Sequence, residues 1–197
     1  MARRGSYAKG VAKREEILER ALDVIAREGF RRTSVKDLAE AVGLSQAGLL
    51  HYFGTKERLF TEILRKRDEL DNAAIGSTPD AGMDADDLRE RWVGVIRHNQ
   101  QVPGLVHLFA AMSVDAADAE HPAHEYFTER NARLREALTD VMRDRLDPRI
   151  DPETASRLLQ AVSDGLQLQW MLEPDLDMAA TTTALLDLIV PPTEEPT

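Results

Sequence analysis

Residues 33–60 read TSVKDLAEAVGLSQAGLLHYFGTKERLF, and this stretch decides the fold of the chain. It contains two short runs with helical apolar spacing, separated by only three residues, Gly-Leu-Ser. Ser34 can cap the first run while Asp37 returns the bond, as in a capping box, and Ser45 can cap the second run. Helices of about eight residues are marginal in water. Packing against each other and against a third helix must therefore hold both.

The second run contains Gly48 where a helix is expected, although glycine lowers helix stability by about 1 kcal/mol relative to alanine. Gly43 can take the positive φ that a sharp reversal between helices requires. Leu49 and Phe53, four residues apart, give the second run one buried face. On the outer side, Gly48 and the small Ala47 let the backbone approach bases or the sugar-phosphate chain. This pattern is typical of a helix-turn-helix, whose second helix presents its N-terminal residues to a major groove.

Several outward residues of this stretch can contact DNA. Gln46 can recognise adenine through N6 and N7, and His51 and Tyr52 can donate to phosphates. Lys56 stands in the first turn of the next helix, where a cation opposes the helix dipole unless a phosphate binds there. A solvated surface lysine and a helical hairpin unrelated to DNA remain the alternatives. The predicted DNA-binding residues are Ser34, Lys36, Ser45, Gln46, Ala47, Gly48, Leu50, His51, Tyr52 and Lys56.

The distribution of charge supports this interpretation, although the net charge is −10. Residues 1–72 hold 15 Lys and Arg against 12 Asp and Glu, whereas residues 73–197 hold 10 against 23. Five basic residues crowd the start of the chain: Arg3, Arg4, Lys9, Lys13 and Arg14. A mildly basic N-terminal part followed by an acidic remainder indicates that one chain has two functions. The alternative is a solvated charged surface with a floppy tail.

The composition is that of an ordinary globular protein, with 43% hydrophobic and 30% charged residues. The sequence has no cysteine, which excludes a disulfide scaffold and a thiolate metal site. No apolar h-region follows the basic N-terminus, and no run approaches the roughly 18 apolar residues of a membrane span. We therefore expect a soluble, cytoplasmic protein without a membrane partner.

Helical spacing continues almost everywhere, and no strand-like alternation stands out. Residues 17–26 have the apolar spacing of an amphipathic helix, which Gly29 can end. Thr55 can cap a fourth helix. After a Gly-, Pro- and Asp-rich linker at residues 75–87, five more helices are predicted, at about residues 84–101, 103–118, 121–147, 152–172 and 176–190. Asp151 is a natural N-cap. The prolines that suit a first helical position are Pro103, Pro122 and Pro152.

Residues 33–60 resemble the DNA-binding unit of the tetracycline-repressor family. The shared pattern is T-x-apolar-basic-D-apolar-A, a Gly-ended turn with Ser, an aromatic-rich H-Y-F, and then K-E-x-L. The resemblance extends from about Lys13 to Leu64. Leu50 stands where the family often has an aromatic residue, and Gly48 where it often has Ser or Thr. Details of operator recognition therefore do not carry over.

The resemblance implies an all-α homodimer of about nine helices. A three-helix helix-turn-helix unit, residues 1–60 with a basic arm at 1–14, is joined by a connecting helix to a ligand-binding and dimerisation body at 61–190. The Pro-rich acidic tail, 191–197, is expected to be disordered. In the family the last two long helices pair across the dimer axis; an intramolecular core is the alternative. Residues suited to that interface are Leu158, Leu159, Val162, Leu166, Trp170, Leu185, Leu186 and Ile189.

A small-molecule pocket in the body would be mostly apolar with a few polar groups. Its candidate residues are Trp92, Ile96, His107, Leu108, Met112, Phe127 and Asn131, each of which also suits a plain core. His121 and His124 have a spacing conceivable for zinc, but they straddle Pro122 at an expected helix start, so we predict no metal and no cofactor. The sequence has no nucleophile elbow, phosphate-binding Gly loop or H-E-x-x-H motif, which argues against an enzyme.

We therefore predict a sequence-specific DNA-binding transcriptional regulator. Its simplest form is a homodimeric repressor that an unidentified small-molecule effector releases from a palindromic, double-stranded operator. One alternative is a regulator or activator that needs no effector or answers to a protein partner. A helical enzyme or carrier is a more distant alternative.

Overall fold

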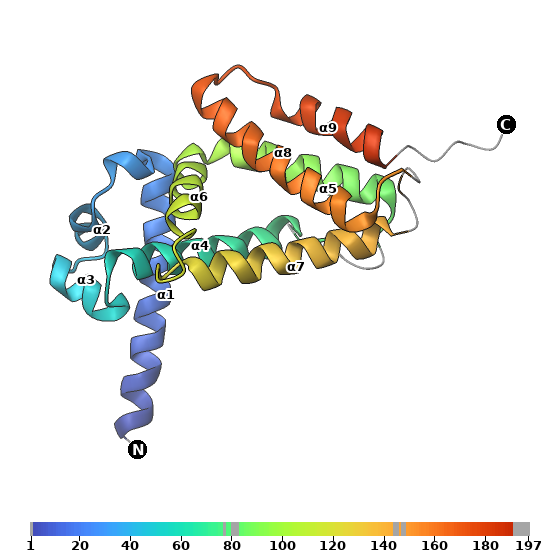
Figure 1. The fold of residues 1–197 in the computed structure, drawn as a ribbon. Helices are drawn as coiled ribbons and strands as arrows, with labels where there is room; N and C mark the ends of the chain where they lie inside the picture. Colours follow the sequence, from blue (N-terminus) through green and yellow to red (C-terminus); the bar gives the residue numbers. More distant parts are fainter. Residues whose placement is uncertain (1, 77, 80–82, 144–145, 147–148, 191–197) are drawn as a thin grey trace. The chain divides into compact units, whose positions relative to one another are not determined.

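The computed structural model describes residues 2–76, 78–79, 83–143, 146 and 149–190, with the side chains of residues 2–8 and 85 left out. Within this part of the chain, all regular secondary structure is helical, which confirms the predicted all-α class (Figure 1). None of its helices is long and apolar enough to span a membrane. The predicted disordered tail, 191–197, lies outside the described residues.

The described residues form nine α-helices and one short 3-10 helix. Their bounds are α1 Ala2–Glu28, η1 Phe30–Arg32, α2 Val35–Ala41, α3 Gln46–Phe53, α4 Lys56–Ile75, α5 Ala85–Gln101, α6 Pro103–Asp115, α7 His124–Met142, α8 Pro152–Leu172 and α9 Met178–Ile189. Residues 2–14, predicted as a basic arm, form the first half of α1.

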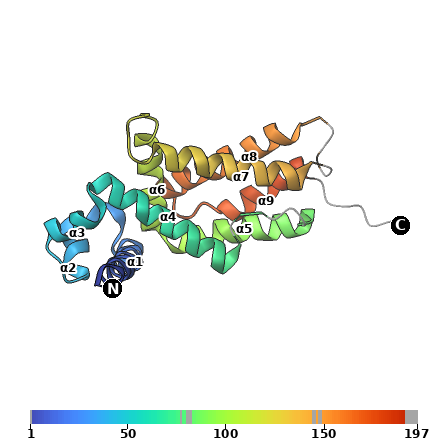
Figure 2. The ribbon, with the colours of Figure 1, turned by 90° about the horizontal axis from the view of Figure 1, so that it is seen from below.

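Packing divides the chain into two compact units, and each is described on its own. Unit 1 contains Met1–Glu69 and Val102–Tyr126, so it includes α1, η1, α2, α3, most of α4 and α6. Unit 2 contains Leu70–Gln101 and Phe127–Thr197, and therefore α5, most of α7, α8 and α9. In unit 1, α1 packs on α2 and α6, and α2 packs on α3. Figure 2 looks along α1, with α2 and α3 beside it.

The core of unit 1 forms where α6 crosses the end of α1. The backbone of Gly104 lies so close to α1 that a Cβ atom there would stand 2.0 Å from the carbonyl oxygen of Ile25. Gly29 ends α1 as predicted: its φ is +85° and its N–H donates to the Ile25 oxygen at 3.0 Å. Two glycines therefore let two helix backbones meet, in a contact between residues 75 positions apart in sequence.

Unit 2 combines an apolar interior with a few polar bonds between helices. The indole N–H of Trp92 on α5 donates to the hydroxyl of Ser163 on α8 at 3.0 Å. Arg89 on α5 pairs with Asp187 on α9 at 3.0 Å. Asp151 caps α8 as predicted, because its carboxylate accepts the N–H of Thr154 at 3.0 Å. The packing of α9 on both α5 and α8 is thus supplemented by specific side-chain pairs.

The predicted start of the seventh helix near Pro122 is wrong, since α7 begins at His124. The imidazole Nδ1 of His121 accepts the backbone N–H of Ala123 at 3.2 Å, and the N–H of His121 donates to the Asp118 oxygen at 3.0 Å. Such local bonds offer the backbone an alternative to the helix. Pro122 therefore lies within a turn instead of opening a helix.

Candidate nucleic-acid interface

The capping box predicted at the start of α2 is present. The hydroxyl of Ser34 accepts the N–H of Asp37 at 3.2 Å, and the Asp37 carboxylate accepts the N–H of Ser34 at 2.8 Å. The hydroxyl of Ser34 also donates to that carboxylate at 2.7 Å. The hydrogen bond from the Ser34 side chain lowers the pKa of Asp37 most, and the bond from the Ser34 backbone N–H lowers it further. The N-terminus of α2 is thereby fixed while both residues stay exposed.

The turn between α2 and α3 is set by Gly43 and Ser45. Gly43 has a φ of +69°, the conformation that the sequence predicted. The N–H of Leu44 donates to the Ala39 oxygen at 2.9 Å, and the Leu44 side chain is half-buried in the turn. The hydroxyl of Ser45 accepts the N–H of Gly48 at 3.1 Å and so caps α3. The turn between the two helices is thus fixed by a backbone bond and a side-chain cap.

The glycine at position 48 has a local structural reason as well as the predicted one. A Cβ atom on Gly48 would lie 3.2 Å from the hydroxyl oxygen of Ser45, closer than most Cβ contacts. The missing side chain therefore leaves room for the cap that begins α3. Together with the exposed Ala47, it also leaves the outer side of the helix without bulky side chains.

Helix α3 turns one face inward and leaves most of its first turn open. Leu49 and Phe53 are buried, as predicted from their spacing. In addition to Ala47, three predicted contact residues in α3 or just before it are exposed: Ser45, Gln46 and His51. Three more are half-buried: Gly48, Leu50 and Tyr52. Gln46 is therefore an exposed long amide in the first turn of α3, able to donate and accept at the same time.

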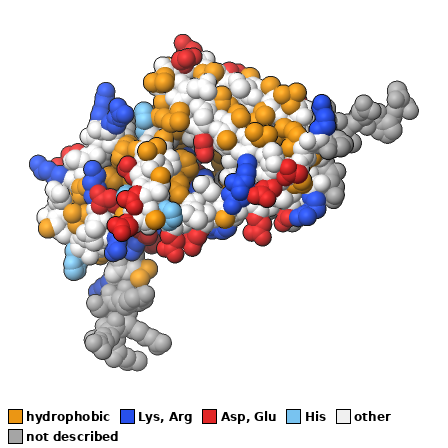
Figure 3. Space-filling view, in the orientation of Figure 1, with side chains coloured by type: hydrophobic (Ala, Val, Ile, Leu, Met, Phe, Trp, Pro, Cys, Tyr) orange, Lys and Arg blue, Asp and Glu red, His pale blue; other side chains and the backbone are white. Residues whose placement is uncertain are grey.

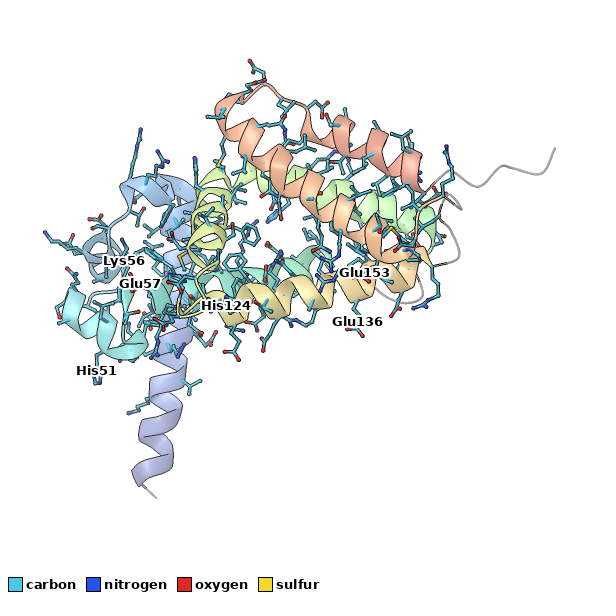
Figure 4. All side chains as sticks on the ribbon, viewed as in Figure 1. His51, Lys56, Glu57, His124, Glu136 and Glu153 are labelled. Atoms are coloured by element: carbon cyan, nitrogen blue, oxygen red, sulfur yellow. The ribbon has the colours of Figure 1, made fainter. Side chains whose placement is uncertain are left out.

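The start of α4 brings a second polar group to the same unit. Thr55 caps this helix, because its hydroxyl accepts the N–H of Arg58 at 3.2 Å. Lys56 is the first residue of α4 and is exposed; its ammonium lies 5.6 Å from the centroid of the Phe60 ring (Figure 4). Lys36 on α2 pairs with Glu40 at 3.7 Å, and its side chain is 72% exposed.

Two of the basic residues near the N-terminus support this geometry instead of lying open to solvent. The ammonium of Lys13 donates to the Val42 carbonyl at 3.4 Å, at the C-cap of α2. The guanidinium of Arg14 pairs with Glu62 at 2.5 Å and lies 4.8 Å from the ring centroid of Phe53. These contacts join α1 to α2, α3 and α4. Their role was not evident from the sequence, where they were simply part of a basic cluster.

Three exposed arginines near the interface are not among the residues predicted from the sequence: Arg31, Arg32 and Arg58. The first two belong to η1, which directly precedes the capping box of α2. Phe30 fixes η1 on α4, because its ring meets that of Phe60 edge-on at 5.3 Å between centroids. The available signal was the doublet of arginines just before Thr33, two positions from Ser34.

The seven predicted pocket residues fall into both units. His107, Leu108 and Met112 lie on α6 in unit 1, whereas Trp92, Ile96, Phe127 and Asn131 belong to unit 2. All five of the apolar ones are buried, and His107 and Asn131 are half-buried. No group of three or more His, Asp or Glu side chains in the described chain is arranged to hold a metal ion.

The predicted dimer residues of α8 and α9 differ in exposure within one chain. Leu159, Leu166, Trp170, Leu186 and Ile189 are buried in unit 2, whereas Val162 and Leu185 are half-buried. The large apolar side chains left exposed on these helices are Leu158 at 41%, Leu168 at 53%, Leu172 at 84% and Leu188 at 72%. Figure 3 shows hydrophobic side chains gathered on the surface over α8 and α9.

Comparison with known proteins identifies both parts of the chain. Residues 17–63 match the model of bacterial regulatory proteins of the tetR family. Residues 86–190, just over half of the chain, match the model of the C-terminal part of BetI-type transcriptional repressors.

Individual relatives agree with these matches. The HTH-type transcriptional repressor KstR2 of Mycobacterium tuberculosis is 26% identical over 165 residues, which cover 76% of each chain. The HTH-type transcriptional regulator RutR of Escherichia coli is 42% identical over 55 residues, 28% of this chain and 26% of RutR. A crystal structure of a transcriptional regulator from Rhodococcus sp. Rha1 superposes with a TM-score of 0.70 at 27% identity, covering 88% of this chain and 91% of that one. The chain therefore belongs to the tetR family of bacterial regulatory proteins and is a DNA-binding transcription regulator, not an enzyme.

Proposed function

We propose that the protein is a homodimeric repressor that binds a near-palindromic operator and leaves it when a small-molecule effector binds. The observation that carries the DNA-binding part is the exposed first turn of α3, held by the Ser45 cap and the Gly43 turn. Gln46 supplies the base-reading amide of this turn, and a glutamine can bond adenine at two positions. Its placement at the start of the second helix is the one that helix-turn-helix proteins use.

Phosphate contacts fix the orientation of this helix on the duplex. Lys56 and the N–H groups at the start of α4 form one phosphate site, and the exposed Lys36 on α2, which Ser34 begins as N-cap, supplies the cation of another. His51 and Tyr52 donate to the backbone of the neighbouring strand. Ala47, Gly48 and Leu50 let the backbone of α3 come close to the DNA, and they form no polar side-chain bonds with it. Such contacts set affinity and register, whereas the choice of sequence comes from the base edges.

A second copy of the chain completes the DNA-binding assembly. The exposed leucines of α8 and α9, with the half-buried Val162 and Leu185, form the apolar surface that we assign to the dimer axis. Contiguous apolar surface of this kind is characteristic of association sites. The recognition helices of a two-fold dimer enter successive major grooves when they lie about 34–36 Å apart, or at a multiple of that distance. The operator then has the two-fold symmetry of the protein.

Effector binding controls the operator affinity by linkage. We assign the pocket to unit 2, around Trp92, Ile96 and Phe127, with Asn131 as a polar group. An effector that prefers the conformation unsuited to DNA by a hundredfold contributes about 2.7 kcal/mol, enough to lower operator affinity substantially. The linkage is reciprocal, so operator DNA lowers effector affinity by the same factor. Because it acts on chromosomal DNA, we place the protein in the cytoplasm.

The test of this proposal is binding of the full chain to the DNA upstream of its own gene, measured by fluorescence anisotropy at several salt concentrations. The expected result is saturable, sequence-selective binding by a dimer, which a ligand of the C-terminal domain weakens. A protein that stays monomeric while saturating a half-site contradicts the dimeric mechanism. Ligands that bind the body without changing DNA affinity contradict effector release.

A further inference from the structure

Unit 1 contains a polar cavity of about 560 Å³, whereas the pocket assigned to the effector belongs to unit 2. Four segments supply its lining: α1, the end of α3, the first half of α4, and the turn from α6 into α7. Its volume suits a small metabolite, but most of the lining side chains are charged or polar, unlike those of a usual apolar pocket. His121 and His124, which the proposed function does not use, both line it.

Part of the charge in the cavity is already compensated. The carboxylate of Glu62 pairs with the guanidinium of Arg14 at 2.5 Å and lies 3.7 Å from that of Arg65. Two other lining residues, Arg58 on α4 and Glu125 on α7, are exposed. Within the described chain, neither of these two makes an ion pair with a neighbouring side chain. The cavity therefore offers one cation and one carboxylate to a ligand.

The two imidazoles add one hydrogen-bond donor and one acceptor. Nδ1 of His121 accepts the backbone N–H of Ala123 at 3.2 Å, so the neutral ring carries its proton on Nε2. Nδ1 of His124 lies 2.9 Å from the carbonyl oxygen of Ala116, which can only accept, so this ring carries its proton on Nδ1. Nε2 is consequently a donor in His121 and an acceptor in His124, which Figure 4 labels at the start of α7.

These four groups complement a small zwitterion. We propose that the cavity is a binding site for a free amino acid. The carboxylate of the amino acid accepts from the guanidinium of Arg58 and from Nε2–H of His121. Its ammonium group donates to the carboxylate of Glu125 and to Nε2 of His124. The side chain of the amino acid is uncharged, because Glu62 already pairs with the remaining arginines of the cavity.

The position of the cavity connects this ligand to DNA binding. Tyr52, a proposed phosphate contact at the end of α3, lines the same cavity as Arg58 in the first turn of α4. A carboxylate bound to Arg58 neutralises a cation on this part of the helix-turn-helix unit, and cations there favour DNA phosphates. The amino acid therefore lowers DNA affinity, and DNA lowers amino-acid affinity by the same factor. This consequence rests on the proposed operator binding, whereas the amino-acid site itself does not.

The first experiment measures amino-acid binding in the absence of DNA. The full chain is titrated by isothermal calorimetry with each of the protein amino acids. An amino acid with an uncharged side chain should bind saturably, and more tightly than aspartate, glutamate, lysine or arginine. For the amino acid that binds best, the N-acetyl derivative lacks the ammonium group and the amide lacks the carboxylate. Each derivative should bind about tenfold more weakly or worse, because it loses a charge-assisted hydrogen bond.

Variants assign the binding to this cavity. Arg58→Ala and Glu125→Gln should each weaken amino-acid binding by about tenfold or more, and both positions are exposed, so the fold should be kept. The N-acetyl derivative has no ammonium group, so Glu125→Gln should bind it as wild type does. The matched controls are Arg133→Ala and Glu136→Gln at exposed positions of α7 in unit 2, which should bind the amino acid like wild type.

Three results would overturn the inference. The first is that no amino acid binds saturably to wild type. The second is that the amino acid and its N-acetyl derivative bind equally well, which would identify an anion site instead. The third is that Arg58→Ala and Glu125→Gln both bind the amino acid like wild type, which would place the ligand elsewhere in the chain.

A second measurement tests the connection to DNA. The affinity for the DNA upstream of the gene is measured by fluorescence anisotropy, with and without the amino acid at a concentration that saturates wild type. The DNA affinity of wild type should fall by about fivefold or more, and that of Glu125→Gln should fall less. An unchanged DNA affinity of wild type overturns the regulatory role. If wild type binds the amino acid but no DNA, the proposed function fails and the amino-acid site stands, so the two failures are distinguishable.

Discussion

Replacement of Gly104 by alanine should disrupt unit 1 more than any other glycine-to-alanine change at a described helical position. The added Cβ would stand 2.0 Å from the Ile25 oxygen and 2.9 Å from the Cα of Gly29. Both are backbone atoms, so no side-chain rotation can relieve the overlap. The crossing of α6 over α1 would have to open by about 1 Å before the contact became tolerable.

The magnitude follows from this geometry. Overpacking a core by one carbon costs about 1–3 kcal/mol, and a clash with backbone belongs at or above the upper end of that range. Each 1 kcal/mol lowers the melting temperature of a protein of this size by roughly 2–4 °C. Gly104→Ala should therefore melt about 6 °C or more below wild type. Operator affinity should fall as well, because α1 supports α2.

The matched control is Gly94→Ala on α5, where a Cβ would meet no atom within 4 Å. The alanine should leave its melting temperature unchanged or raise it, because alanine favours the helix. Thermal unfolding followed by circular dichroism at 222 nm compares the three proteins. If Gly104→Ala melts within 2 °C of Gly94→Ala, the close crossing of α1 and α6 is wrong.

Three further outcomes follow from the interface. Lys56→Ala should weaken binding to all sequences and lower the salt slope by about one per half-site, and an unchanged affinity and slope would exclude this phosphate contact. The folded protein lowers the pKa of Asp37, so this carboxylate stabilises the fold above the unfolded pKa of 3.8 and stops doing so as pH falls through the folded pKa. Asp37→Asn should remove this part of the pH dependence of stability in unfolding titrations. Leu188→Asp should shift the sedimentation coefficient from dimer to monomer, whereas an unchanged dimer would place the interface elsewhere.

The local features of the helix-turn-helix were predictable because their causes lie within a few residues. The capping box of Ser34, the positive φ of Gly43 and the Ser45 cap each depend on neighbours no more than five positions away. The helix starts at Pro103 and Pro152 were predictable for the same reason. Short-range chemistry of this kind is written directly in residue type and spacing.

Features that depend on distant residues were not predictable. Nothing in the sequence near Gly104 indicates that it meets the Ile25 carbonyl, 79 positions earlier. The pairing of Arg14 with Glu62 likewise depends on the folded arrangement of α1 and α4. A basic residue in a cluster cannot be assigned to DNA or to an internal ion pair by its identity alone.

The apolar stripes of α8 and α9 show a further limit of pattern analysis. A core face and a dimer face both require apolar side chains at helical spacing. Leu159 and Leu186 were predicted at a dimer interface but are buried within one chain, whereas Leu168 and Leu172, which lie outside that stripe, are exposed. Exposure in the folded chain separates the two uses, and spacing does not.

The most direct test of the account is an in vitro selection of DNA sequences by the full chain and by Gln46→Ala, performed in parallel. Wild type should select a near-palindrome with half-sites about 10 base pairs apart, or a multiple of that. Gln46→Ala should relax the preference at one position in each half-site, with a loss of about 1–3 kcal/mol there. The same motif from both proteins, or a motif without two-fold symmetry, would contradict recognition by paired α3 helices.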